Sequence, residues 1–228
     1  MRCAIQFGLL ALFLDAALAQ TQSGAIEILK KVGEAYKNVS QYEFEADTST
    51  DENGTRAVSH MHFAFKAPDK YRMEGGLGTV FGEGVIVHDG SSLWFYSPKS
   101  NQYASIPASA LTADNAGKLG ELRPQALDYF MTGRYRRAAD FIDGAKFLRE
   151  ESVEIAGVKV ACYVVTVSPQ SPNLTYTWWV DQKRYRVLRE DDAGNSAVFT
   201  SIKLDEPIRD ELFAFEPPAG ARKREVQP

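Results

Sequence analysis

The hydrophobic pattern of the chain changes its period once, near residue 40. Between Ser23 and Asn38, apolar side chains recur every three or four positions, which predicts an amphipathic helix with Ser23 as its N-cap. These apolar positions are Ile26, Leu29, Val32 and Tyr36. From Gln41 to Thr50, apolar residues alternate with acidic and polar ones, which is typical of a strand with one solvated face.

Alternating segments continue on both sides of a central interruption. The segment Thr55–Lys66 follows the turn signal Asn53-Gly54, which predicts a hairpin. Further strands are expected at residues 70–74, 84–90, 92–98 and 101–107, and then at 145–157, 159–168, 174–181, 185–191 and 196–204. Residues 108–143 lose the alternation and indicate short helices joined by Gly and Pro. From Phe213 onward we expect one short strand, a Pro-Pro stop and a frayed basic end.

The strand around Leu93–Tyr96 has large apolar side chains on both faces, and so do the later strands that contain Tyr163 and Trp178. A solvated antiparallel sheet needs only one apolar face, because side chains alternate sides. Two apolar faces predict a curled sheet with helices pressed into its concave side. Two interpretations stay open for these aromatic residues: a plain core, or the lining of a ligand site. The pattern does not reveal which face is concave.

Composition places the chain among ordinary globular proteins. Of its 228 residues, 44% are hydrophobic and 25% are charged, and the formal net charge is −4. These values suit a single domain and lack the strongly basic balance that nucleic-acid binding requires. We expect a monomer with no nucleic-acid partner.

The first residues have the pattern of a secretory signal peptide. Arg2 precedes an apolar run at residues 5–14, and small residues follow at Ala17 and Ala19. Cleavage after Ala19 leaves a mature domain of residues 20–228. Because the apolar run is too short to span a membrane, we expect an exported, soluble protein of the bacterial periplasm.

Cysteine usage argues against an internal disulfide. Cys3 lies inside the signal peptide, away from the place of a lipid-anchored cysteine, so Cys162 is the one cysteine of the mature chain. Since Cys162 lies in an apolar strand, we expect a buried and unreactive thiol.

Candidate catalytic and metal sites are weak. His60 and His62 share one strand face and could form a metal pair, but Arg56 and Lys66 share that face too, which favours a solvated surface. The glycine-rich stretch Gly75–Gly84 lacks the strand-to-helix context of a phosphate-binding loop. No nucleophile motif is present. The sequence therefore predicts no enzyme, no cofactor and no metal.

A cluster of arginines follows the interruption. Arg134, Arg136 and Arg137 could contact an anionic headgroup or an acidic partner. A solvated helix end or turn is the simpler interpretation and is favoured.

Four segments carry a resemblance to a known family. Residues 28–49, 63–75, 85–107 and 213–221 resemble, in order and spacing, the periplasmic lipoprotein carrier LolA and its wider family, which includes LolB and RseB. The motifs "DGSSLWFYSP" and "FAFEPPAGA" are the more specific parts. In their order and spacing the segments extend over most of the mature chain, from residue 28 to residue 221.

The resemblance implies a mainly β fold, an unclosed antiparallel β-barrel of about eleven strands whose N-terminal helix and helical insert cover the concave face over an apolar cavity. It also implies a ligand, an acylated lipoprotein or another lipid, with inner-membrane donor and outer-membrane acceptor proteins as partners. On this basis the expected cavity residues are Phe44, Met61, Phe63, Phe65, Tyr71, Met73, Trp94, Tyr96, Tyr163 and Trp178.

One position departs from the family pattern. Carriers of this kind have an arginine before the proline of the third-strand segment, where it holds the lid, whereas Ala67 stands here with Lys66 beside it. Control of the lid must therefore differ. The alternative function is that of an RseB-like sensor, which would detect lipid or mislocalised lipoprotein and act through a protein partner.

Overall fold

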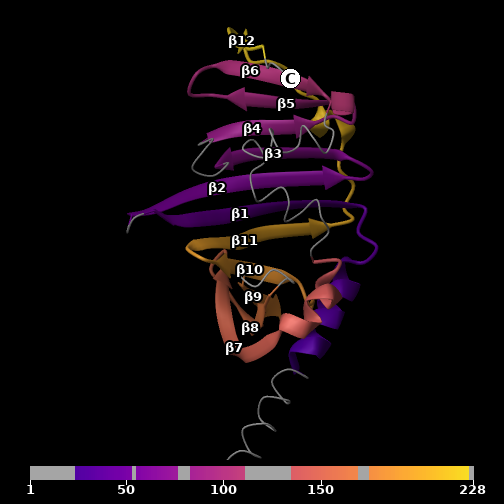
Figure 1. The fold of residues 1–228 in the computed structure, drawn as a ribbon, viewed down its shortest axis with the longest axis vertical. Helices are drawn as coiled ribbons and strands as arrows, with labels where there is room; N and C mark the ends of the chain where they lie inside the picture. Colours follow the sequence, from indigo (N-terminus) through magenta and orange to yellow (C-terminus); the bar gives the residue numbers. More distant parts are fainter. Residues whose placement is uncertain (1–23, 53–54, 77–82, 111–134, 169–174, 226–228) are drawn as a thin grey trace, which may run out of the picture. The chain divides into compact units, whose positions relative to one another are not determined.

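The computed structural model describes residues 24–52, 55–76, 83–110, 135–168 and 175–225. The chain forms two compact units (Figure 1). The first unit joins Met1–Lys37 to Arg134–Ser196, and the second joins Asn38–Gly133 to Ala197–Pro228. The predicted helical insert lies largely outside the described residues.

In the first unit a helix accompanies antiparallel strands. The helix covers residues 24–36 and is followed, after residue 134, by the short 3-10 helix η3 (Ala138–Gly144). The strands are β7 (Lys146–Ile155), β8 (Val158–Val167), β9 (Tyr176–Asp181) and β10 (Val187–Asp192), hydrogen-bonded in the order β10-β9-β8-β7. Each pair is antiparallel.

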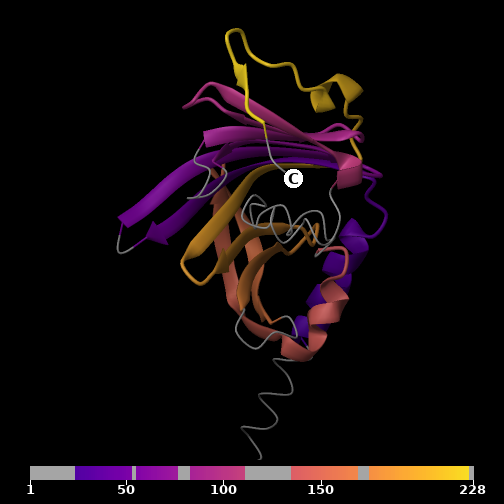
Figure 2. The same ribbon diagram turned by 45° about the horizontal axis from the view of Figure 1, so that its top comes forward.

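The predicted amphipathic helix is confirmed. Ala25, Leu29 and Val32 are fully buried, because they recur at the spacing of one helix face, while Lys30 and Glu34 remain exposed on the other. Gly33 lies close to the backbone near η3: a Cβ added there would stand 3.4 Å from the carbonyl oxygen of Arg136. The helix and the segment before η3 are thus in close contact at this position (Figure 2).

The second unit is built on a longer antiparallel sheet. Its strands are β1 (Gln41–Glu52), β2 (Thr55–Lys66), β3 (Lys70–Gly76), β4 (Glu83–His88), β5 (Ser92–Ser97), β6 (Gln102–Pro107), β11 (Asn195–Leu204) and the short β12 (Arg222–Lys223). Two 3-10 turns, η1 (Ala108–Ala110) and η4 (Asp210–Phe213), complete its described elements. The strand order is β12-β6-β5-β4-β3-β2-β1-β11. Neighbouring strands from β1 to β6 pair antiparallel, whereas β12 pairs with β6 in parallel.

The expected fold class is confirmed: a mainly β chain with an unclosed antiparallel sheet and an N-terminal helix. Strand β11 begins in the first unit and continues into the second, and the hydrogen-bonded order contains 12 strands with β12 and β7 at its ends. The resemblance implied about eleven strands, and the two-residue β12 is too short for alternation to detect.

The C-terminal segment, Asp205–Glu225, is part of the second unit's packing. Ile208, Leu212 and Phe213 pack on Ala64 of β2, and the ammonium of Lys66 donates to Oδ1 of Asp210 at 2.8 Å. Figures 1 and 2 show the segment in yellow, running from β11 to β6.

The expectation of a frayed basic tail was wrong. The amide of Arg222 donates to the carbonyl of Asn101 at 3.0 Å, and the amide of Arg224 donates to that of Tyr103 at 2.8 Å. The edge of β6 offers unpaired backbone groups, and pairing with β12 satisfies some of them. The segment "FAF" forms η4 and irregular backbone in place of the expected strand.

Candidate functional site: an apolar sheet face

Strand register in the second unit brings apolar side chains from β1 to β6 onto one face of the sheet. Directly opposite residues of an antiparallel ladder point to the same side, so each row of partners can be followed across the strands. One row is Tyr42, Phe65, Tyr71, His88, Leu93 and Ile106. The next is Phe44, Phe63, Met73, Ile86, Phe95 and Ala104. We call these two rows the apolar face.

No aspartate, glutamate, lysine or arginine stands in either row. Phe63 and Met73 at its centre are fully buried, whereas Phe65 and Phe95 are half-buried. The face therefore combines fully buried residues of β2 and β3 with partly accessible rings at Phe65 of β2 and Phe95 of β5.

Aromatic rings are stacked across β1 and β2. The rings of Phe44 and Phe63 are 5.1 Å apart, and those of Tyr42 and Phe65 are 5.2 Å apart. Phe199 of β11 meets Phe44 edge-on at 5.3 Å. Such pairs are stabilised beyond simple burial, which makes this part of the face rigid.

One ring on the apolar face carries nitrogen. His88 is buried, and its ring stacks on that of Tyr71 with centroids 5.3 Å apart and planes 12° apart. Nδ1 of His88 accepts a hydrogen bond of 3.3 Å from the amide of Gly90. His88 is not among the lining residues expected from the sequence, although its spacing from Ile86 places both on the same side of β4.

Trp94 and Tyr96 lie on the opposite face of β5. Trp94 stands opposite Val87 and Ser105, and its ring stacks on Phe215 at 5.3 Å. The register thus separates this pair from Met73, and a ligand-lining role for Trp94 and Tyr96 stays a prediction. The ring of Tyr96 is 6.3 Å from that of Phe215. The C-terminal segment therefore covers the second face of β5.

The turn between β4 and β5 is organised by one carboxylate. Oδ1 of Asp89 accepts from the amides of Ser91 and Ser92 at 2.7 and 2.8 Å. Partial burial acts to raise the pKa of Asp89, but these bonds and the one from Trp94 outweigh it and lower the pKa from 3.8 to about 2. The carboxylate is thus ionised at neutral pH and holds the turn in place.

The remaining predicted lining residues lie in the first unit. Tyr163 and Trp178 share one face of β8 and β9, since Val165 pairs with Trp178 and Tyr163 with Val180. Trp178 is fully buried and meets Tyr135 and Phe141 edge-on at 5.2 and 5.7 Å. These contacts make Trp178 part of that unit's core.

A buried carboxylate accompanies Trp178. Oε2 of Glu190 accepts from the indole Nε1 of Trp178 at 2.7 Å and from the hydroxyl of Tyr135 at 3.1 Å. The ring of Tyr36 lies 5.3 Å from that of Tyr135, and desolvation raises the pKa of Tyr36 to about 12. Sequence reasoning missed Glu190, since its acidic neighbours Asp191 and Asp192 suggest a solvated strand end.

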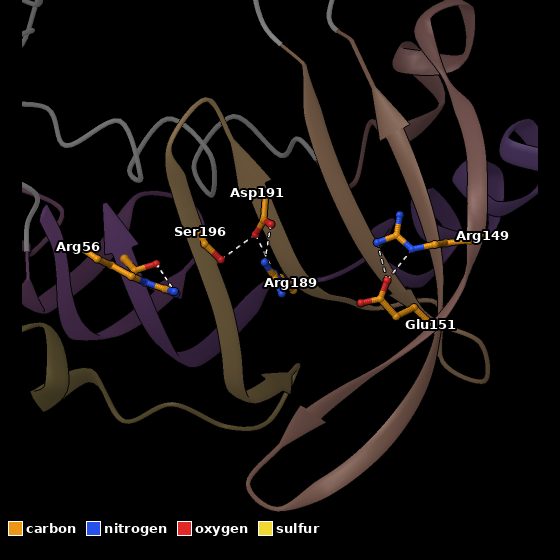
Figure 3. Close-up of polar contacts among 7 residues, drawn as sticks. Arg56, Arg149, Glu151, Arg189, Asp191 and Ser196 are labelled. Carbon is orange, nitrogen blue, oxygen red and sulfur yellow. Dashed lines mark hydrogen bonds and ion pairs between the residues drawn. The ribbon is translucent and has the colours of Figure 1, made fainter. Parts of the chain in front are cut away.

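The outer side of the first unit's strands has paired charges (Figure 3). Arg149 pairs with Glu151 at 2.5 Å, and Arg189 pairs with Asp191 at 2.6 Å. The guanidinium of Arg189 also lies 4.4 Å from the ring centroid of Trp179. Each arginine has a carboxylate two residues along its own strand, so this surface is neutralised locally.

The predicted arginine cluster is only partly described. Arg136 and Arg137 are exposed, and Arg137 lies 3.9 Å from Asp140, while Arg134 falls outside the described residues. A contact with a headgroup or partner therefore stays a prediction.

The histidine pair of β2 meets carboxylates of β1. His60 Nδ1 is 2.9 Å from Asp47 Oδ1, and His62 Nε2 is 2.9 Å from Glu43 Oε1. In the described part of the chain, no group of His, Cys, Asp and Glu side chains is arranged to hold a metal ion. The favoured interpretation, a polar strand face, agrees with these contacts.

Ala67, at the position where the resemblance led us to expect an arginine, is exposed, and its amide donates to the carbonyl of Ser40 at 2.8 Å. Its neighbour Lys66 donates to the carbonyl of Ile208 at 2.9 Å as well as to Asp210. Lys66 therefore holds the C-terminal segment of the same unit.

Several solved structures resemble the chain at low identity. The Pseudomonas aeruginosa MucA/MucB complex matches with a TM-score of 0.47 and 14% identity, over 84% of this chain and 61% of that one. LolA superfamily protein NE2245 of Nitrosomonas europaea matches at 0.35 and 16%, over 84% and 97%. LprF of Mycobacterium bovis matches at 0.44 and 11%, over 82% and 95%. One of these three structures is named as a LolA superfamily protein.

The sequence itself has relatives. Uncharacterized protein MJ0687 of Methanocaldococcus jannaschii is 26% identical over 202 residues, which are 88% of this chain and 54% of that protein. The chain therefore spans about half the length of this relative. Within the described residues, no helix is both long enough and apolar enough to cross a membrane. A family model matches residues 25–227, and the chain belongs to the family that it describes, "Predicted periplasmic protein (DUF2092)".

Proposed function

We propose that this protein binds acyl chains in the periplasm, against the apolar face of its second unit, and carries them as part of a lipoprotein or as another lipid. One observation carries the proposal: two complete rows of side chains across β1 to β6 contain no Asp, Glu, Lys or Arg. The sequence resemblance to lipoprotein carriers supports the same function.

The energetics suit a carrier. An acyl chain that moves from water to an apolar surface gains about 0.8 kcal/mol per methylene group. When the acyl chain moves from a membrane to the protein, its surroundings are apolar before and after the transfer, so the net gain in free energy is small. A carrier needs this near-balance, because very tight binding would prevent release.

Binding without catalysis is part of the proposal. The apolar face offers one imidazole, at His88, and tyrosine hydroxyls at its edge, which is the composition of a ligand-binding surface with a few orienting polar groups. Hydrolysis or transfer would need a nucleophile with a base beside it.

Co-purified lipid tests the function. The protein would be exported by a Gram-negative host, purified without detergent and extracted for mass spectrometry, in parallel with a Phe95→Glu variant. The wild type should bring acyl-containing lipid or acylated protein, and the variant should lose it, because an unpaired carboxylate on the apolar face is costly. Acyl species in equal amounts from both proteins, or in neither, would contradict the proposal.

Export is tested separately. The intact mass of the periplasmic protein should correspond to loss of the first 19 residues with no acyl addition, as the Ala17 and Ala19 pattern predicts. A lipid-modified mass or an uncut chain would contradict this part.

A further inference from the structure

His88 is the one imidazole on the apolar face. The residue is only 7% exposed to solvent, and its neighbours in the row are Tyr71 and Leu93. Burying a polar ring among apolar groups is unfavourable unless its nitrogens form hydrogen bonds. The position therefore raises the question of what each nitrogen does.

Nδ1 is occupied by the turn that follows β4. The amide of Gly90 donates to it at 3.3 Å, and Gly90 has a φ of +94°, a conformation that glycine adopts without strain. Asp89 fixes the same turn through its bonds to Ser91 and Ser92. Because Nδ1 accepts a hydrogen bond, the neutral ring carries its proton on Nε2.

Nε2 is therefore a donor, and it lies on the ring edge away from the turn. Gly90 is the hydrogen-bond partner that the structure gives to His88, and the described residues provide none for Nε2. The stacked ring of Tyr71 limits rotation of the imidazole. An N–H donor with a fixed direction, carried by a residue that is only 7% exposed, is thus present on an otherwise apolar surface.

We infer that Nε2 of His88 donates a hydrogen bond to the carbonyl or carboxyl oxygen of an acyl ligand and so sets which end of the chain lies at β4. This rests on the proposed function, since it assumes an acyl ligand on the apolar face. An acyl group has an acceptor oxygen at one end and methylene groups along its length. The oxygen would meet the single donor at His88, and the methylene groups would meet the rest of the apolar face. A few well-placed polar groups commonly orient a ligand in an apolar site.

Displacement of an uncharged fluorescent probe, N-phenyl-1-naphthylamine, separates the contribution of the hydrogen bond to ligand affinity from that of apolar contact. Dodecanoic acid, its methyl ester and dodecane would compete with the probe on the wild type, on His88→Phe and on His88→Gln. His88→Phe keeps a ring against Tyr71 but removes the donor, and His88→Gln restores an N–H. His88→Phe should bind the acid and the ester about tenfold more weakly and dodecane within about twofold, with partial recovery in His88→Gln.

Each result is informative. Loss for both acid and ester indicates recognition of the carbonyl, and loss for the acid alone indicates recognition of a carboxylate; both support the inference. Equal loss for all three competitors, or no loss, would overturn it while leaving acyl binding intact. Failure of all three to displace the probe from the wild type would refute the proposed function, and the inference with it.

A spectroscopic readout covers the case in which His88→Phe does not fold. The chain has 3 histidines, so the imidazole nitrogens of the wild type can be resolved and assigned by NMR with His60→Gln and His62→Gln variants. Addition of dodecanoic acid should shift the Nε2 resonance of His88 and leave those of the other two in place. An unchanged His88 resonance at saturating acid would overturn the inference.

Discussion

The indole Nε1 of Trp94 donates a hydrogen bond of 2.9 Å to Oδ2 of Asp89. Oδ1 of the same carboxylate holds the turn through the amides of Ser91 and Ser92, so a single side chain joins the turn to the first part of β5. This bond also keeps Trp94 on the face that the C-terminal segment covers. One carboxylate therefore ties the turn and the indole of Trp94 together.

Replacing Asp89 by asparagine should lower the free energy of unfolding by about 1–2 kcal/mol at neutral pH, since the hydrogen bonds lose their charged acceptor. The folded pKa of Asp89 is about 2, below its usual 3.8. The carboxylate therefore stabilises the fold above pH 3.8, and this contribution is lost as the pH falls toward 2. Urea unfolding of both proteins across this range should show their difference shrink with acidification. A difference independent of pH would contradict the assignment.

Truncation of Phe213 tests the packing of the C-terminal segment. Phe213 is 1% exposed and packs on Ala64, so Phe213→Ala should cost about 3–5 kcal/mol. Phe215 is half-buried, and Phe215→Ala should cost less. Because both rings lie away from the apolar face, binding of a fatty-acid probe to the folded variants should be unchanged. Weaker probe binding with little loss of stability would show that the segment belongs to the ligand site.

Glu190 is predicted to stabilise the core of the first unit. Glu190→Ala removes the acceptor shared by Tyr135 and Trp178, and we expect a loss of about 2–4 kcal/mol in chemical denaturation. Glu190→Gln keeps a carbonyl oxygen at that position and should cost clearly less. Equal losses in the two variants would mean that the charge, and not the hydrogen bonding, is the stabilising feature.

The thiol of Cys162 should be unreactive in the native protein. Burial raises its pKa to about 11, so very little thiolate exists at neutral pH, and the side chain has no exposed surface. A maleimide should label it only after denaturation. Val158 lies on the same strand and is 63% exposed, so Val158→Cys in a Cys162→Ser background provides the reactive control. Native labelling of Cys162 at the rate of this control would contradict the burial.

The sequence was sufficient for features that depend on local periodicity. The helix that buries Leu29 and Val32, and the strands that alternate around Phe44 and Phe63, follow from their spacing. The resemblance supplied the unclosed sheet. The pairing of Arg222 with Gln102 at the sheet edge was not predicted, because a strand of two residues is too short to show an alternating pattern in the sequence.

The assignment of faces could not be predicted. Along β5, Leu93 and Phe95 point to one side, and Trp94 and Tyr96 point to the other. Because both pairs are apolar, periodicity alone does not show which pair belongs to the apolar face. The choice depends on contacts far apart in sequence: Trp94 meets Phe215, whereas Phe95 stands opposite Ile86. In contrast, the place of His88 on the face of Ile86 follows from their spacing in one strand.

The central claim, that the apolar face binds acyl chains, is tested most directly by two adjacent residues of β5. Phe95 belongs to the apolar face, whereas Tyr96 lies on the opposite side near Phe215, and both are half-buried. Phe95→Ala and Tyr96→Ala remove aromatic rings of similar size, so stability losses should be comparable, about 1–3 kcal/mol each.

The measurement is the dissociation constant of a fluorescent fatty-acid probe for the wild type and for these two variants, with folding checked by circular dichroism. Phe95→Ala should weaken probe binding about tenfold, because a lost aromatic contact with an acyl chain is worth roughly 1–2 kcal/mol, and Tyr96→Ala should leave it within about twofold. Equal weakening by both, or weakening by Tyr96→Ala alone, would contradict the claim that this face binds the ligand.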